Sequence, residues 1–206
     1  MTAIIDVLQS AGAFLVGLLA RVGIFLGMLA VLALPALAVA LAGHWISDRR
    51  RRALGLRRVA GILFRPSVWY APGHTWLARR GAGALEVGLD DLALRLLPSV
   101  TAVEVPRVGT PVRKGEVVAR LHGGGREIAI PSPVAGTVAG VNAAVLRDPA
   151  LVKRDGYGRG WLVALCPADL AFENLPRGAQ AEEFIRGESR RFGAFLEERL
   201  GFAAAD

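Results

Sequence analysis

The chain has 206 residues, of which 53% are hydrophobic and 21% charged, and its formal net charge is +7 at pH 7. Much of the positive excess lies beside an apolar segment instead of being interleaved with aromatic residues, a distribution that argues against nucleic-acid binding. The single cysteine, Cys166, agrees with a reducing compartment.

Residues 1–47 have the composition of a membrane anchor. Residues 22–46 carry no Asp, Glu, Lys or Arg. As a helix with a rise of about 1.5 Å per residue they would span roughly 37 Å, more than the ~30 Å hydrocarbon core of a bilayer. We predict one transmembrane helix here. Asp6, Gln9 and Arg21 interrupt the apolar segment before it, which we interpret as an interfacial or helical extension and not as a second span.

A cluster of arginines follows the predicted span, in a segment (residues 48–71) that we interpret as a juxtamembrane linker. The expected lipid-facing collar consists of Arg49, Arg50, Arg51, Arg52, Arg57 and Arg58. An excess of arginine next to a span marks the cytoplasmic side, and each cation gains on the order of 1 kcal/mol near anionic headgroups. We therefore expect a single-pass protein of the cell inner membrane, with its N-terminus outside, its folded domain in the cytoplasm and membrane lipids as partners.

Two segments rich in β-branched and alternating residues, 116–121 and 127–131, flank a run of three glycines. Glycines between such segments supply the positive φ angles of a hairpin turn. The sequence therefore predicts a β-hairpin with Gly123, Gly124 and Gly125 at its tip.

A longer pattern surrounds this hairpin. Its blocks are His74-Thr75-Trp76, residues 87–93, residues 103–109, residues 132–136, and residues 142–162 with the ending Tyr157-Gly158-Arg159-Gly160-Trp161-Leu162. Over roughly residues 72–186 the chain resembles the H protein of the glycine cleavage system. The resemblance implies a mainly-β, lipoyl-like (barrel-sandwich hybrid) domain with short helices at residues 72–178, of a size suited to one hydrophobic core.

In the H-protein family a lysine at the hairpin tip, seven residues before the Ser of Ser-Pro-Val, carries lipoate. The resemblance places Gly125 at that position. The chain has only two lysines, Lys114 and Lys153, and neither lies at the tip. The resemblance therefore implies a degenerate carrier domain that holds no cofactor and takes no small-molecule substrate.

Other residues of chemical interest have structural explanations. His74 is interpreted as a hydrogen-bonding residue, His44 as an interfacial one, and His122 lacks the neighbouring ligands that a metal site needs. The carboxylates of Asp90 and Asp91 are expected to cap a helix, since acidic residues favour its first turn. No catalytic triad, phosphate-binding loop or dinucleotide motif is present in the sequence, so we do not expect an enzyme.

Residues 179–206 form a predicted amphipathic helix and tail. Its apolar stripe is a candidate partner-binding surface and comprises Phe184, Ile185, Phe192, Phe195, Leu196 and Leu200. The pattern leaves open whether this stripe packs on the β-domain or on a partner protein.

These features together predict a non-catalytic accessory subunit of a bacterial-type membrane complex, for example a respiratory or energy-converting one, held by protein–protein contacts. One alternative is a membrane-tethered carrier modified at Lys114 or Lys153. Another is an export-system adaptor, although the coiled-coil heptads expected there are missing from the sequence.

Overall fold

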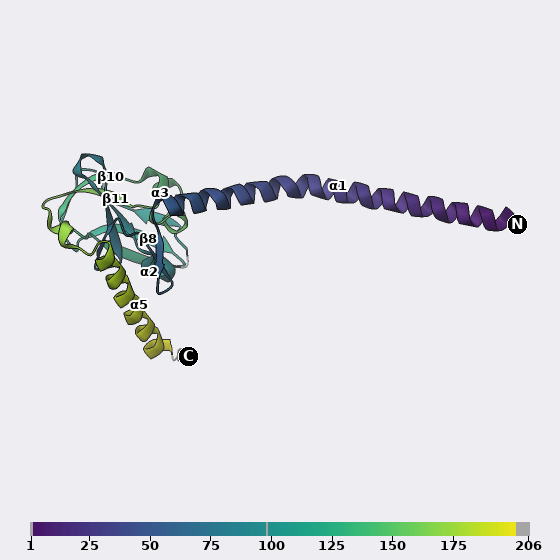
Figure 1. Ribbon diagram of the computed structural model, residues 1–206. Coiled ribbons are helices and arrows are strands. Elements are labelled where there is room, and N and C mark those ends of the chain that lie inside the picture. The colour runs from purple at the N-terminus through teal and green to yellow at the C-terminus, as the bar shows by residue number, and fades with distance from the viewer. Residues whose placement is uncertain (1, 98, 201–206) are drawn as a thin grey trace. The chain divides into compact units, whose positions relative to one another are not determined.

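The computed structural model describes residues 2–97 and 99–200, and the chain divides into two units, Met1–Arg50 and Arg51–Asp206 (Figure 1). The first unit is one long helix, which continues for three residues into the second unit. The second unit contains all the strands of the described residues.

Helix α1 (Thr2–Ala53) is continuous over 52 residues and runs on through Pro35. Within it, residues Gly17–Gly43 have a mean hydropathy of 2.6, so this stretch is long and apolar enough to cross a membrane by length and composition alone. The described apolar side chains of this stretch are exposed. The apolar segment before the predicted span is part of the same helix.

The larger sheet of the second unit has six strands in the order β3-β4-β5-β11-β10-β7, and all neighbours are antiparallel. Its strands are β3 (Trp69–Ala71), β4 (Thr75–Arg79), β5 (Leu85–Leu89), β7 (Pro111–Val112), β10 (Gly136–Val141) and β11 (Val163–Pro167). Strands β3, β4 and β5 are buried almost continuously, so this part of the sheet has buried side chains on both of its faces.

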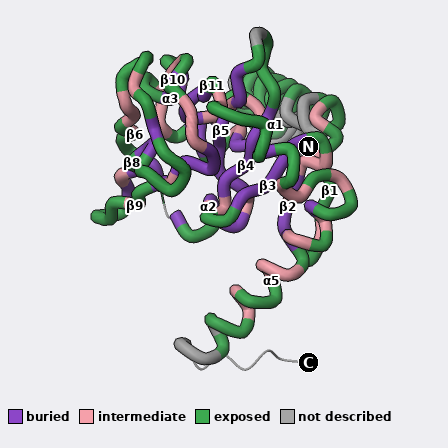
Figure 2. The backbone as a smooth tube through the Cα atoms, turned by 90° about the vertical axis from the view of Figure 1, so that its left-hand side faces the viewer, coloured by how far each residue is buried: buried purple, intermediate pink, exposed green. Residues whose placement is uncertain are grey.

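A smaller antiparallel sheet consists of β6 (Ala102–Glu104), β8 (Val117–Gly123) and β9 (Arg126–Pro131), in the order β6-β8-β9. Its inward side chains meet those of the larger sheet in two hydrophobic clusters. Val118 of β8 packs with Leu77 and Val87 in one cluster, and Leu121 of β8 packs with Leu89 in the other. The mainly-β, lipoyl-like domain predicted from the sequence is thereby confirmed in its general form, with its core between the two sheets (Figure 2).

Short helices and turns connect the strands. They are η1 (Gly81–Gly83), α2 (Asp91–Leu96), α3 (Ala143–Arg147), α4 (Leu151–Arg154) and η2 (Ala171–Asn174). Asp90 caps α2 by accepting a hydrogen bond from the Ala93 N–H, and Asn142 caps α3 through the Ala144 N–H. The interpretation of Asp90 as a helix cap is confirmed.

A third hydrophobic cluster lies on the other side of the larger sheet. Strands β1 (Arg57–Val59) and β2 (Ile62–Phe64) form a hairpin whose residues Ile62 and Phe64 are buried together with Tyr70 and Trp76. Helix α5 (Ala179–Leu200) closes this cluster with Ala181 and Ile185. Residues 57–71, expected from their arginines and aromatics to be a linker, are instead strands and turns of the domain. Burial of apolar side chains on one face stabilises these short strands.

Candidate functional site

The β8–β9 hairpin has a two-residue turn at its tip. Gly123 pairs with Arg126, which leaves Gly124 and Gly125 as the two central residues, with φ angles of 59° and 72°. Positive φ at both central positions defines a type I′ turn, the form that matches the twist of the flanking strands. The hairpin predicted from the glycine run is confirmed, and its tip presents backbone without side chains.

The first glycine of the run has a different role. A Cβ atom built on Gly123 would lie 1.7 Å from the backbone oxygen of Ser99. The adjoining chain is held there because the Thr101 N–H donates a hydrogen bond to the His122 carbonyl at 2.8 Å. By contrast, a Cβ on Gly125 would meet nothing within 4 Å. Gly123 is therefore required by close packing, whereas Gly125 is required only by its backbone angle.

Charged side chains line the outer face of the small sheet. His122 on β8 has its Nε2 3.1 Å from Glu104 Oε1 and its Nδ1 4.0 Å from Glu127 Oε2, and Arg120 forms an ion pair with Glu127. The Nε2 atom is buried and has no hydrogen bond of good geometry. The described residues contain no group of three or more His, Cys, Asp or Glu side chains that could hold a metal ion.

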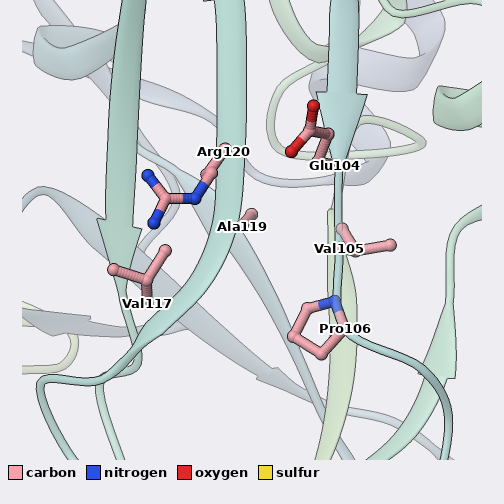
Figure 3. A pocket seen from close by; sticks show the side chains of 6 residues that line it. All are labelled: Glu104, Val105, Pro106, Val117, Ala119 and Arg120. Atoms are coloured by element: carbon pink, nitrogen blue, oxygen red, sulfur yellow. The ribbon is translucent and has the colours of Figure 1, made fainter.

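A small hollow of about 170 Å³ opens between β6 and β8, where the two strands separate (Figure 3). Figure 3 shows the Glu104 carboxylate on one strand and the Arg120 guanidinium on the other, with Pro106 below. Of the two charged residues on its rim, Arg120 is paired with Glu127, and Glu104 lies next to His122.

The two lysines lie away from the hairpin tip. Lys114 is exposed on the turn between β7 and β8, beside a hollow of about 120 Å³ whose other lining residues include Pro133 and Phe172. Lys153 on α4 donates a hydrogen bond from its Nζ to the Leu97 carbonyl. Of the two amines, only that of Lys114 stands on a turn.

His74 and Asp90 form a partly buried pair. The His74 Nδ1 lies 3.1 Å from Asp90 Oδ2, and the Asp90 side chain is fully buried. The hydrogen bond to Asp90 raises the pKa of His74, against the opposing effect of burial. His74 thus links the start of β4 to the N-terminus of α2, as expected for a structural residue. The His44 side chain lies outside what the structure describes.

The His74 pair predicts a pH-dependent stability. Because the folded-state pKa is raised above the unfolded value, the stabilisation is fully present below the unfolded pKa of about 6.5 and is lost as pH rises through the folded pKa. We expect the natural chain to exceed a His74→Gln variant in free energy of unfolding, and we expect the difference to be larger at about pH 6 than at about pH 9. The first pH lies below the unfolded pKa of His74 and the second lies above it. Urea titrations of both proteins at the two pH values measure this, and an equal advantage at both would contradict it.

The candidate partner-binding stripe of α5 is used mainly by the domain itself. Ile185 is buried, while Phe184 and Phe192 are partly buried against the same cluster. Phe195 is 51% exposed, and the side chains of Leu196 and Leu200 lie outside the described part of the chain. Among the described side chains of α5, Phe195 in the distal half is the exposed large apolar one.

The predicted arginine collar spans both units. Arg49 lies over the Trp45 ring at 5.2 Å, and Arg52, Arg57 and Arg58 are exposed. The side chains of Arg50 and Arg51 are outside the description.

Comparison with known proteins gives the domain its family. The family model described as "Glycine cleavage H-protein" matches residues 68–188. The chain belongs to this H-protein family. It is 40% identical over 122 residues to the glycine cleavage system H protein of Thermus thermophilus, covering 59% of this chain and 94% of that protein. The corresponding protein of Shewanella loihica is 37% identical over 107 residues, covering 52% and 83%.

The fold agrees with a solved H protein. The crystal structure of a glycine cleavage system H protein from Mycobacterium marinum superposes with a TM-score of 0.52 and 27% identity, covering 60% of this chain and 99% of that one. The long N-terminal helix, the β1–β2 hairpin and the end of α5 lie outside the residues matched by the H-protein model.

Sequence reasoning missed the β1–β2 hairpin and the His74–Asp90 contact. A signal for the hairpin was present, since Ala60-Gly61 sits between Val59 and Ile62. The pairing of His74 with Asp90 joins residues 16 positions apart and has no local sequence signal.

Proposed function

We propose that this chain is a membrane-anchored H-protein relative that is not lipoylated and acts as an accessory subunit of a membrane protein complex. The observation that carries the proposal is the hairpin tip, where Gly124 and Gly125 expose only backbone. The resemblance to carriers puts their lysine at position 125. A tip without a nucleophilic side chain has no atom to which an acyl arm can be attached.

The membrane anchor and the partner contacts that we propose depend mainly on segments outside the residues matched by the H-protein family model. Helix α1 supplies the anchor, with residues Gly17–Gly43 as the membrane span. The arginines after it favour the cytoplasmic side, so the domain lies in the cytoplasm and the N-terminus outside. The proposed contact surfaces for other subunits are the distal part of α5, where Phe195 is exposed, and the side-chain-free tip.

A second candidate is a carrier whose arm is attached to Lys114. It is favoured by one observation, the exposed amine on a tight turn in which Gly115 has φ of 85° and donates its N–H to the Ser132 carbonyl. The adjacent hollow with apolar walls could take part of an acyl chain. Lys153 is a poorer site because its amine is already bonded to a carbonyl.

One purification tests the two candidates together. The full chain is isolated from membranes of its native cells in a mild detergent, its intact mass is measured, and proteins that remain with it are identified. We expect an unmodified chain that co-purifies with other membrane subunits. A Gly125→Lys variant incubated with a lipoate ligase is the matched control, because open space surrounds position 125. A lipoyl increment on the natural chain, or a chain that behaves as a lone monomer, would contradict the proposal.

A further inference from the structure

The β1–β2 hairpin joins the apolar helix to the H-protein domain and is fixed to that domain. Ile62 and Phe64 are 3% and 1% exposed. The Leu63 N–H donates a hydrogen bond to Asp91 Oδ2 at 2.9 Å, and the Tyr157 hydroxyl donates to the Leu63 carbonyl at 3.1 Å. Buried side chains on one face and hydrogen bonds from two other segments make the hairpin move with the domain.

The chain between the helix and the hairpin is short. Helix α1 ends at Ala53 and β1 begins at Arg57, so three residues connect them. Three residues cover at most about 10 Å when fully extended. The segment is not extended, because the Gly55 N–H donates to the Arg52 carbonyl at 3.0 Å in a turn with φ of 62°. A hairpin attached in this way stays close to the end of α1 at all times.

The exposed charge of the hairpin is entirely positive. Arg57 and Arg58 are exposed, and among the side chains that the structure describes neither has an ion-pair partner. Many other arginines of the domain have carboxylate partners, namely Arg79, Arg80, Arg95, Arg120, Arg154, Arg186 and Arg191. No acidic residue occurs in the sequence between Arg49 and Leu85. The charge on the hairpin is thus left without a balancing group in its own segment.

We infer that the β1–β2 hairpin is a docking surface for anionic lipid headgroups and sets the orientation of the H-protein domain on the bilayer. The inference rests on the proposed function, since it needs α1 in a membrane. Lipid is the proposed occupant because only three residues of chain separate the hairpin from the end of α1. Ten residues follow Gly43 before α1 ends, and among them Arg49 covers the Trp45 ring, a pairing suited to the headgroup zone. Phosphate groups complement both the charge and the fork geometry of the guanidinium.

The test uses the full chain in vesicles of phosphatidylcholine, with or without phosphatidylglycerol. In a Cys166→Ser background, Ala60→Cys places a fluorophore on the β1–β2 turn, and lipids with a spin label at the headgroup act as quenchers. A matched probe at Val108→Cys, 60% exposed between β6 and β7, reports on the domain away from the hairpin. We expect quenching at position 60 to be about twofold greater with the anionic lipid and to weaken at high salt, where charge screening shortens to a few Å.

A charge variant isolates the arginines. Arg57→Gln with Arg58→Gln should abolish the difference between the two kinds of vesicle, whereas Arg126→Gln, an exposed arginine of the β8–β9 hairpin, should leave it unchanged. Equal quenching at position 60 in both vesicles would overturn the inference and assign these arginines to an acidic protein surface instead. Alkaline extraction of the same samples distinguishes failure of the membrane anchor from failure of the docking surface. A chain that is washed off the vesicles contradicts the membrane anchor itself, while a retained chain without charge-dependent quenching contradicts only the docking surface.

Discussion

A Gly123→Ala variant is expected to lose about 3 kcal/mol or more of its free energy of unfolding, a large share of the roughly 5–15 kcal/mol typical of a folded domain. The added Cβ would lie 1.7 Å from the Ser99 oxygen and 2.7 Å from its carbonyl carbon. These are backbone atoms, which cannot rotate away as the end of a long side chain can. Relief requires the segment before β6 to move away from β8, with loss of the Thr101 hydrogen bond to His122. Urea unfolding of the full chain in detergent, followed by tryptophan fluorescence, measures the loss.

The matched control is Gly125→Ala, two residues away in the same glycine run. No atom lies within 4 Å of the Cβ that it adds, so its only cost is the positive φ, on the order of 1 kcal/mol. Similar losses for the two variants would mean that Ser99 does not approach β8 as closely as described. The comparison also bears on function, because a small cost at position 125 leaves the tip able to accept a lysine in the lipoylation control.

The second large effect is expected for Ile185→Ala on α5, which should lower the free energy of unfolding by about 2–5 kcal/mol. Ile185 is 1% exposed and shares its cluster with Ile62 and Phe64 of the β1–β2 hairpin. Its truncation leaves a cavity between the helix and the hairpin. Because the hairpin leads to α1, the same change should increase amide hydrogen exchange in residues 57–64, which is measurable by mass spectrometry.

Phe195→Ala is the control on the same helix. At 51% exposure it contributes little burial, so its stability loss should be well below that of Ile185→Ala. If Phe195 lies on a partner surface, the variant should lose co-purifying subunits while keeping its fold. A loss of stability as large as that for Ile185→Ala would contradict the division of α5 into a buried half and a more exposed half.

Several parts of the fold could be predicted from local sequence. The glycine run between two alternating segments predicts the β8–β9 hairpin, because only glycine enters its turn angles at low cost. Asp90 before an apolar run predicts the cap of α2. The uncharged residues 22–46 predict a long helix, although its observed length of 52 residues exceeds the predicted span.

The remainder depended on contacts between distant segments. The spacing of apolar residues in α5 predicts an amphipathic helix with one apolar face. The spacing does not specify whether Ile185 packs on its own domain or on another protein. In sequence, Arg57 and Arg58 resemble part of a basic linker. Their segment forms a hairpin because Ile62 and Phe64 are buried, and this burial depends on Trp76 and α5. Likewise, the difference between Gly123 and Gly125 is set by Ser99, more than 20 positions away in sequence.

The central claim is that this H-protein relative has lost the carrier site and retains the fold on a membrane anchor. The most direct measurement is the intact mass of the natural chain, purified from the membrane fraction of cells that lipoylate their other carrier proteins. The account predicts the mass of the unmodified polypeptide, with no acyl increment on Lys114 or Lys153. A stoichiometric lipoyl increment at either lysine would contradict the account and make the chain a carrier.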